Sequence, residues 1–372
     1  MDDDTLCALA LHRTPGVGPA LWRRLHDAFG SPAGVLGAPD SALRSLGVPA
    51  ETRTAIARPD WRQAQADAAW LDGGDGRHLL RLDTPDYPAR LAETTDPPPL
   101  LFVTGCPQAL GHPQVAIVGS RHASASGQDL AYDLAGALAE SGLVVTSGLA
   151  AGIDAAAHRG ALATAGGCSN AIIATGPDRT YPAYHRALQQ SLAQHGAVAG
   201  ENPPGTPPLA GLFPRRNRIV SGLSLAVVVV QAGTRSGALI TARLAGEQGR
   251  EVLAVPGSIH DPMARGCHAL LRQGAKLVES VHDILEELPG HAFEAPAPQP
   301  QAVNLDPAAP SPDDDEQILL KALGYDPVPL DTLLQRSGLT LDRLSSILLD
   351  MELKGLVAAV PGGRYQRRKP EG

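Results

Sequence analysis

The chain has 372 residues, and 31 Lys and Arg against 39 Asp and Glu give it a formal net charge of -8. This length predicts two or three domains, and the acidic balance excludes a uniformly basic protein but not a local basic groove. Four widely separated cysteines favour neither a zinc site nor a disulfide framework, and the start of the chain lacks a signal-peptide pattern, so we expect a cytoplasmic protein without a cofactor or a membrane segment.

Residues 1–72 alternate short apolar segments with Gly-rich turns, a pattern that predicts a small helical domain. The turn Gly16-Val17-Gly18 resembles that of a helix-hairpin-helix motif, in which backbone amides approach a phosphate. Leu46-Gly47-Val48 resembles the same turn less closely. Both also fit an ordinary tight turn between helices, and the sequence leaves the two interpretations open. A short strand at 79–82 follows, with Asp96-Pro-Pro-Pro99 as a breaker.

From Gln114 to about Pro289, short apolar runs alternate with helical stretches. The runs are too apolar to face water on one side, which indicates buried strands. The alternation predicts an α/β core with a doubly wound, mainly parallel sheet, whose ligand crevice lies beyond the carboxyl ends of the strands. The expected strands are 115–118, 143–146, 171–174, 197–198, 225–230, 252–255 and 276–278.

Residues 290–312 are rich in Pro and Ala and lack periodicity, which indicates a linker. Three helical stretches (317–323, 330–337 and 341–353) and a hairpin follow, and this order predicts a winged helix. The expected domains are a helical domain at 1–72, the α/β core at 73–289, the linker at 290–312 and the winged helix at 313–372.

The loops at the carboxyl ends of the strands carry the candidate chemistry. Gly119-Ser120-Arg121 ends the first core strand before a helix and offers small residues, backbone amides and a cation, as a phosphate cradle does. The Gly-x-Gly-x-x-Gly spacing and the ribose-binding acid of a dinucleotide site are absent, which argues against a dehydrogenase. Gly148 and Gly152 follow the next strand and again stand at the N-terminus of a predicted helix.

Asp154 and His158 follow in that helix. Asp154 stands where a capping or first-turn carboxylate belongs, and a lone histidine one turn later is more often a hydrogen-bonded packing residue than a general base. We therefore favour structural roles for both, with catalysis as the lesser alternative.

The segment between Glu201 and Glu247 contains no acidic residue and five arginines, so it carries a net charge of +5 in an acidic chain. Because these arginines flank loops at the strand ends, the pattern favours a groove for a polyanion over a solvated cluster. Phe213 could stack on a base or belong to the core, and composition leaves both open. The further candidates are Arg179, Arg215, Arg216, Asn217, Arg218, Arg235, Ser236 and Gly237.

Several motifs occur here in the order found in the DNA processing protein A family, also called DprA or Smf, which this chain resembles over about residues 75–289. They are Val118-Gly-Ser-Arg121, Ser147-Gly-Leu-Ala150, Gly152-Ile-Asp154 with His158, Tyr181-Pro182, Pro203-Pro-Gly-Thr206, Phe213-Pro-Arg-Arg-Asn-Arg218, Ser236-Gly-Ala-Leu-Ile-Thr-Ala242 and Ala254-Val-Pro-Gly257.

The resemblance implies an extended Rossmann-like core at 73–289, preceded by a SAM-like domain at 1–72. It further implies a protein that binds and protects single-stranded DNA in natural transformation and loads RecA onto strands coated by single-strand binding protein, without being an enzyme. It also implies a homodimer, for which we expect the region of Leu270 and Leu271. Carried over by motif, Gly119, Ser120 and Arg121 would hold a phosphate and Phe213 would stack a base. Arg215, Asn217 and Arg218 would line the groove.

The chain departs from the family pattern at several positions. Ala183 and Ala210 stand where many relatives have lysine, and Gln231 stands where Glu is usual. Arg179, His185 or Arg216 could supply the missing charge.

Two other functions stay open from the sequence. A Rossmann-like phosphoribohydrolase would place a catalytic Glu soon after a Gly-Gly-x-Gly-Thr loop, whereas here no carboxylate follows residue 231 until Glu247. A duplex-binding regulator would use the third helix of the winged helix, which has only Arg343 in its first half, beside Asp342. The basic end at Arg364, Arg367, Arg368 and Lys369 could still touch a DNA backbone.

Overall fold

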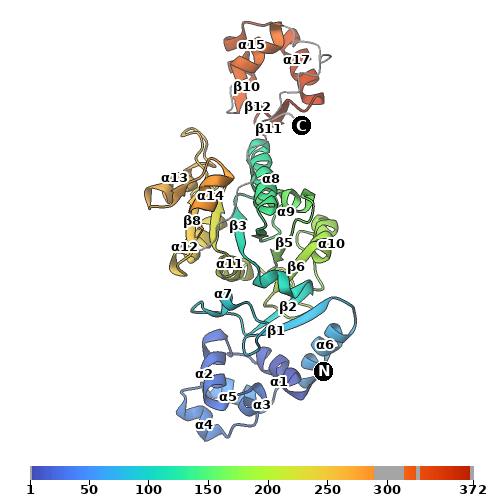
Figure 1. The fold of residues 1–372 in the computed structure, drawn as a ribbon, viewed down its shortest axis with the longest axis vertical. Helices are drawn as coiled ribbons and strands as arrows, with labels where there is room; N and C mark the ends of the chain where they lie inside the picture. The colour runs from blue at the N-terminus through green and yellow to red at the C-terminus, as the bar shows by residue number, and fades with distance from the viewer. Residues whose placement is uncertain (1, 289–313, 324–326, 369–372) are drawn as a thin grey trace.

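The computed structural model describes residues 2–288, 314–323 and 327–368. Figure 1 shows the chain in three parts along the long axis: blue N-terminal helices, a central sheet with helices around it, and a red C-terminal part. No helix among these residues combines the length and apolar character needed to cross a membrane.

The N-terminal part consists of six helices that pack on the edge of the central sheet. Asp2, Ser31 and Asp60 cap three of them, each accepting a hydrogen bond from a backbone amide of the first turn. Their core includes Trp22 and continues to Phe102 of the sheet. The helices are α1 (Asp3–His12), α2 (Pro19–Phe29), α3 (Pro32–Leu36), α4 (Asp40–Ser45), α5 (Ala50–Ala57) and α6 (Trp61–Asp72).

Both predicted Gly turns join helices of this part. Gly16 lies between α1 and α2 with a φ of +83°, and a Cβ there would overlap the side-chain oxygen of Thr52. Glycine is therefore required by backbone conformation and by the close approach of α5. Gly47, between α4 and α5, also has a positive φ.

The central sheet has nine strands in the order β1-β2-β6-β5-β4-β3-β7-β8-β9. All pairs from β6 to β9 are parallel, and the β1–β2 hairpin adds an antiparallel edge. The strands are β1 (Arg77–Arg81), β2 (Leu100–Gly105), β3 (Gln114–Val118), β4 (Val144–Ser147), β5 (Ser169–Ile172), β6 (Gly196–Gly200), β7 (Ala226–Val229), β8 (Glu251–Ala254) and β9 (Lys276–Leu277).

This topology confirms the predicted fold class and the predicted core strands, with shifts of one or two residues at their ends. The sequence analysis missed β2, which begins directly after the proline run at 97–99. Proline cannot donate in a strand ladder, so the run marked a break, but the ladder starts just beyond it.

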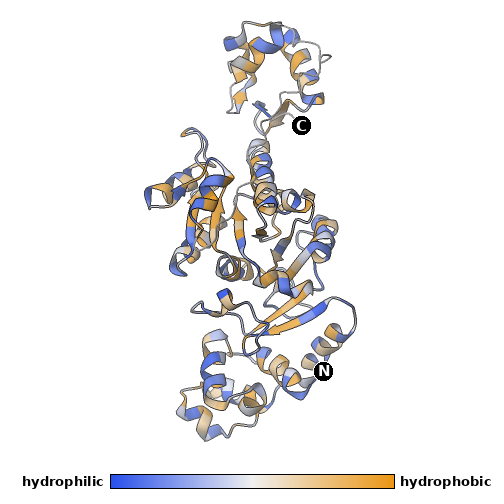
Figure 2. Cartoon of the chain, in the orientation of Figure 1, coloured by the Kyte–Doolittle hydropathy of each residue, from blue (hydrophilic) through white to orange (hydrophobic). Residues whose placement is uncertain are grey.

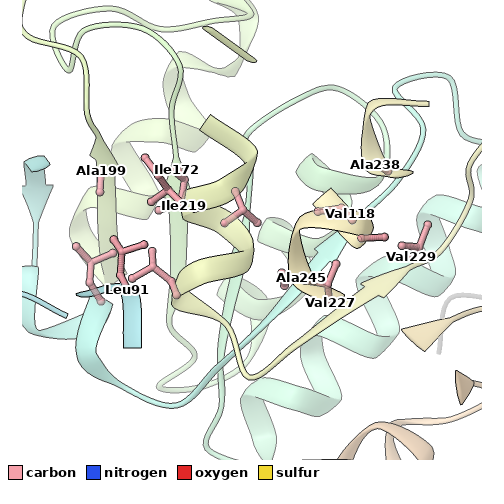
Figure 3. Packing of buried hydrophobic residues seen from close by; sticks show 14 of the residues in the cluster. Leu91, Val118, Ile172, Ala199, Ile219, Val227, Val229, Ala238 and Ala245 are labelled. Atoms are coloured by element: carbon pink, nitrogen blue, oxygen red, sulfur yellow. The ribbon is translucent and has the colours of Figure 1, made fainter. Parts of the chain in front are cut away.

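Alternate residues of each strand face two helical layers. On one face, Val115 and Ile117 pack with α8 (Ala125–Glu140), α9 (Ile153–Ala163) and α14 (Val281–Glu286). On the other, Val118, Val227 and Val229 pack with α11 (Leu212–Leu223) and α12 (Gly237–Glu247), as Figure 3 shows. Figure 2 shows most strands of the central sheet toward the hydrophobic end of the scale, as burial on both faces requires, while the edge strand β1 is partly hydrophilic. The other helical segments are α7 (Ala89–Ala92), η1 (Pro107–Gly111), η2 (Ala183–His185), α10 (Arg186–His195) and α13 (Arg265–Arg272).

The strand order reverses between β3 and β7. From β3 the chain adds β4, β5 and β6 on one side, and then returns to add β7, β8 and β9 on the other. The loops after β3 and β7 therefore diverge to opposite faces, which opens a crevice at the carboxyl edge of the sheet.

The C-terminal part confirms the predicted winged helix. A three-stranded sheet, β10-β12-β11, packs on three helices around a core that includes Leu344 and Met351. Only the two-residue β10 was not predicted, while the predicted linker 290–312 and Lys369 lie outside the described residues. The elements are α15 (Asp314–Leu323), β10 (Val328–Pro329), α16 (Leu330–Ser337), α17 (Leu341–Leu353), β11 (Val357–Val360) and β12 (Arg364–Arg367).

Candidate nucleic-acid interface

A cavity of about 740 Å³ occupies the crevice between the loops after β3 and β7. Most of the predicted site residues lie on its wall, although they come from four separate segments of the chain. These are Gly119, Ser120, Arg121, Gly148, Phe213, Arg216, Asn217, Arg235, Ser236 and Gly237. The other four predicted residues, Gly152, Arg179, Arg215 and Arg218, are not part of the wall.

The loop after β3 is fixed by close backbone contacts. The Ser120 amide donates to the carbonyl of Gln231, 2.6 Å away, and a Cβ on Gly152 would overlap the Ser120 carbonyl. Gly152 has a φ of +76°, so it shapes the loop from behind instead of facing the cavity. The Ser120 amide thus already donates a hydrogen bond within the fold. The exposed side chain of Arg121 is what this loop offers to the cavity.

Phe213, near the start of α11, lies between a cation and a second aromatic ring. The Arg121 guanidinium carbon is 5.4 Å from its ring centroid, and the Tyr181 ring centroid is 5.2 Å away on an inclined plane. Phe213 is half-buried and lines the cavity with both partners. Its ring therefore lies on the cavity wall and is not part of the buried core.

Arg216 brings a buried positive charge to the cavity wall. Its side chain is 5% exposed, its Nη1 donates to the carbonyl of Ile172 at 2.5 Å, and its Nε has no hydrogen-bond partner among the described residues. Burial lowers the pKa of Arg216 to about 10, so the group stays charged at neutral pH. An uncompensated buried donor on a cavity wall is suited to an anionic ligand.

Asp154 is the carboxylate on this wall. Its Oδ2 accepts hydrogen bonds from the amides of Gly148 and Ala150 at 3.1 and 3.3 Å, in the first turn of α9. Burial raises the pKa of Asp154, and the nearby Arg216 opposes this rise. Asp154 is thus a first-turn carboxylate of α9, and Gly152 occupies the cap position.

His158 lies one turn further on and is fully buried. Its Nδ1 is 2.8 Å from Ser169 Oγ, and burial lowers its pKa to about 3. His158 does not line the cavity. It is the hydrogen-bonded packing residue that the sequence analysis favoured.

Arg215 and Arg218 lie on the same helix as Arg216 but turn to another partner, Glu201 at the end of β6. Arg218 Nη2 is 2.5 Å from the Glu201 carboxylate, and Arg215 Nε is 3.2 Å from it. Arg218 Nε is also 3.1 Å from Asp96. Since Glu201 is only 3% exposed, this cluster ties α11 to the sheet.

Arg179 lies outside the wall, in the loop after β5. Its side chain is about half exposed, and its Nε is 3.9 Å from the carboxylate of Asp178. Asp178 in turn accepts a hydrogen bond from the Gly205 amide at 2.8 Å, which joins two loops beside the cavity.

Among the wall residues that were not predicted site residues are His122, Tyr181 and Arg265. Arg265 starts α13, after β8, whose carboxyl end lies at the same edge of the sheet. This position after a parallel strand is the sequence signal from which Arg265 could have been predicted as a site residue. With Arg265 included, the wall carries four arginines, at 121, 216, 235 and 265, against the single carboxylate of Asp154. A surplus of fixed positive charge in a crevice attracts polyanions.

Within the described residues, no group of three His, Cys, Asp or Glu side chains is placed to hold a metal ion. The chemistry of the cavity is therefore that of arginines, small polar side chains and aromatic rings.

Two family models match this chain. The model described as DNA recombination-mediator protein A covers residues 78–289, and the DprA winged helix domain covers residues 303–363. Protein Smf of Escherichia coli (strain K12) is 41% identical over 319 residues, which are 83% of this chain and 82% of that protein. DNA processing protein DprA of Streptococcus pneumoniae is 47% identical over 201 residues, 54% of this chain and 71% of that protein.

Solved structures agree with this match. The X-ray structure of DprA from Streptococcus pneumoniae aligns with a TM-score of 0.67 at 35% identity, over 78% of this chain and all of that one. DNA processing protein A of Helicobacter pylori, solved to study its mode of binding single-stranded DNA, aligns with a TM-score of 0.51 at 28% identity, over 56% of this chain and 94% of that one. The sheet topology, the winged helix and these matches together place the chain in the DprA/Smf family of DNA recombination mediators.

Proposed function

We propose that this protein binds single-stranded DNA in the cavity at the carboxyl edge of the sheet and delivers it to a RecA-type recombinase in the cytoplasm. The proposal rests above all on one observation: four arginines and the Phe213 ring share one cavity wall with a single carboxylate. Arginines would hold phosphates, and the ring would stack on a base.

The arrangement of the wall supports a single strand as the ligand. The Phe213 ring lies beside Arg121 and Tyr181 in a half-buried position on the cavity wall, where it would stack on an unpaired base. The solved Helicobacter pylori relative, whose single-strand binding mode is described, shares this fold over most of its length.

The winged helix supplies a weaker case for duplex binding. On α17, Arg343 Nε is 2.7 Å from Asp315, and Lys354 Nζ is 3.0 and 2.6 Å from Glu316 and Asp350. Because acidic partners neutralise these cations, the helix expected to enter a major groove carries little positive field.

The same cavity favours binding over turnover. A phosphoribohydrolase would need a catalytic carboxylate in the cavity, but the Asp154 carboxylate on this wall accepts two backbone hydrogen bonds and lies in the field of Arg216. We therefore propose a non-enzymatic mediator, and we expect no release of free base from nucleoside monophosphates.

We further propose a homodimer that uses the β9 edge of the sheet. β9 is the last strand in the sheet order, and Leu277 on it is about half exposed. Leu270, which the sequence analysis placed in this interface, is 9% exposed and packs into the protein's own core, with Leu271 against it. Leu277 is thus the better probe of the dimer.

Fluorescence anisotropy of labelled oligo-dT and of a matched duplex, over a series of salt concentrations, tests the proposal. We expect preference for the single strand, with log K falling by about 0.7 per neutralised phosphate for each unit of log salt. Arg121→Ala should weaken single-strand binding and reduce that slope.

Arg243→Ala is the matched control, because Arg243 is an exposed cation of α12 that pairs with Glu247 and does not line the cavity. Equal or tighter binding of the duplex, unchanged by Arg121→Ala, would overturn the proposal. Loading of a RecA-type recombinase is tested separately, by strand exchange with oligonucleotides already coated by single-strand binding protein.

A further inference from the structure

The winged helix contacts the core through its second wing strand. Arg368, which follows β12, forms a two-point ion pair with Asp129 on α8, with Nε and Nη2 at 3.1 and 2.7 Å from the two carboxylate oxygens. Gln366 of β12 donates to Ser126 Oγ at 2.5 Å, and its side chain is almost fully buried. Figure 1 shows β11 and β12 at the end of α8.

These contacts continue as hydrogen bonds into the core. Ser126 Oγ is 3.1 Å from Ser124 Oγ, the cap of α8. Gln231 then donates from its side chain to Ser124 Oγ and accepts from the Ser124 amide, both at 2.9 Å. Its backbone carbonyl accepts from the Ser120 amide. A continuous path therefore joins the wing to the loop that carries Arg121.

The path leaves little freedom for its central residue. A Cβ on Gly127 would overlap the side-chain amide of Gln231, so Gln231 is held against the first turn of α8. A displacement of that turn must therefore move Gln231, and with it the partner of the Ser120 amide.

The wing does not obstruct the cavity proposed for DNA. It borders a second cavity of about 560 Å³ on the α8 side of Gln231, which Gln366 and Arg368 line together with Asp129. None of these three residues lines the first cavity. Docking of the winged helix can thus hold the 119–121 loop from the side of the second cavity, while the first cavity stays open to a single strand.

We propose that the winged helix is an intramolecular clamp: its wing docks on α8 and, through Ser126, Ser124 and Gln231, holds the 119–121 loop in the form that binds a single strand. The inference rests on the proposed function of the first cavity. Its physical basis is linkage between two equilibria. If docking of the wing stabilises the form of the loop that binds DNA, docking raises the affinity for DNA, and bound DNA strengthens docking by the same factor.

Charge reversal across the ion pair tests the clamp in the full chain. Arg368→Glu and Asp129→Arg should each release the wing, seen as faster amide hydrogen exchange in residues 364–368 and in the first turns of α8. Each should also weaken oligo-dT binding by about fivefold or more, the lower end of typical couplings between sites. The double variant Asp129→Arg/Arg368→Glu restores a pair and should recover both readouts.

Asp129→Arg is the sharpest variant, because it adds positive charge to the core and a purely electrostatic effect would tighten DNA binding. Arg364→Glu is the matched control for Arg368→Glu: it makes the same charge change on β12, where Arg364 donates to the carbonyl of Pro361 in its own turn. Glu140→Arg, at the exposed far end of α8, is the control for Asp129→Arg. Neither control should release the wing.

A double-mutant cycle tests the path itself. Gln231→Met keeps the length of the side chain but removes its hydrogen bonds to Ser124, so Arg368→Glu should have little further effect on DNA binding in that background.

The outcomes separate the two proposals. If the unaltered protein fails to bind oligo-dT, the proposed function fails. If it binds, and exchange shows a released wing with unchanged affinity, the clamp is refuted and the proposed function stands. Additive effects of Gln231→Met and Arg368→Glu would equally refute the path.

Discussion

The guanidinium of Arg216 lies directly against the backbone of Gly148, where a Cβ atom would overlap it. The two residues come from α11 and from the loop after β4. Gly148 thus makes room for the buried charge on the cavity wall, and this requirement of space explains its place in the site better than contact of its backbone with a phosphate.

Gly148→Ala should displace Arg216 and weaken binding of oligo-dT by about tenfold, or about 1.4 kcal/mol, since the cavity loses a fixed cation. Anisotropy titration at constant salt measures this loss. Gly246→Ala on α12 is the control, because a Cβ there meets nothing within 4 Å. Unchanged affinity in Gly148→Ala would mean that Arg216 can relax without cost to the site.

Phe213 should contribute by stacking. We expect Phe213→Ala to cost about 1–3 kcal/mol of single-strand binding, while Phe213→Tyr keeps a ring between Arg121 and Tyr181 and stays near the parent affinity. Quenching of a fluorescent base analogue in the oligonucleotide reports the stacking directly. Loss of affinity in both variants, with no change in quenching in either, would contradict the assignment.

Arg265 should count as a phosphate contact although the sequence analysis did not select it. Removal of one such contact lowers the slope of log K against log salt by about 0.7, so Arg265→Ala should show this change over a salt series. Arg272→Ala is the comparison, since Arg272 is an exposed cation of the same helix that does not line the cavity. Equal slopes in the two variants would remove Arg265 from the site.

Two histidines, the fully buried His158 and the partly buried His12, should make the protein sensitive to acid. Burial lowers the pKa of His12 to about 4 and that of His158 to about 3, against 6.5 for an exposed histidine. Between pH 6.5 and about 4 the unfolded chain binds protons that the folded chain does not. As the pH is lowered through this range, the free energy of unfolding should therefore fall by about 1.4 kcal/mol per pH unit for each histidine.

Urea unfolding at pH 7, 6, 5 and 4.5 measures this dependence. His158→Gln should reduce the slope of the free energy of unfolding against pH by the contribution of one histidine, about 1.4 kcal/mol per pH unit. His282→Gln, at an exposed residue of α14, should leave the slope unaltered. A parent protein with no pH slope over this range would show that neither buried histidine is kept neutral by the fold.

The sequence alone determined the sheet and the winged helix because their signals are local. Val115 to Val118 are apolar at every position, and a four-residue run of this kind must be buried on both faces. The glycines and Arg121 after that strand were placed at the carboxyl edge by the topology rule for parallel sheets, and the structure places them there.

Tertiary structure decided what each arginine does. Arg215, Arg216 and Arg218 are close neighbours in the sequence, but a helix turns about 100° per residue, so Arg216 projects away from the face that Arg215 and Arg218 share. Arg216 reaches the cavity, whereas Arg215 and Arg218 reach Glu201, a partner at the end of β6. Arg265 joins the wall from a distant helix. Residue type and spacing fix which side chains are available, but the field inside a cavity depends on which of them the fold brings together and which it pairs elsewhere.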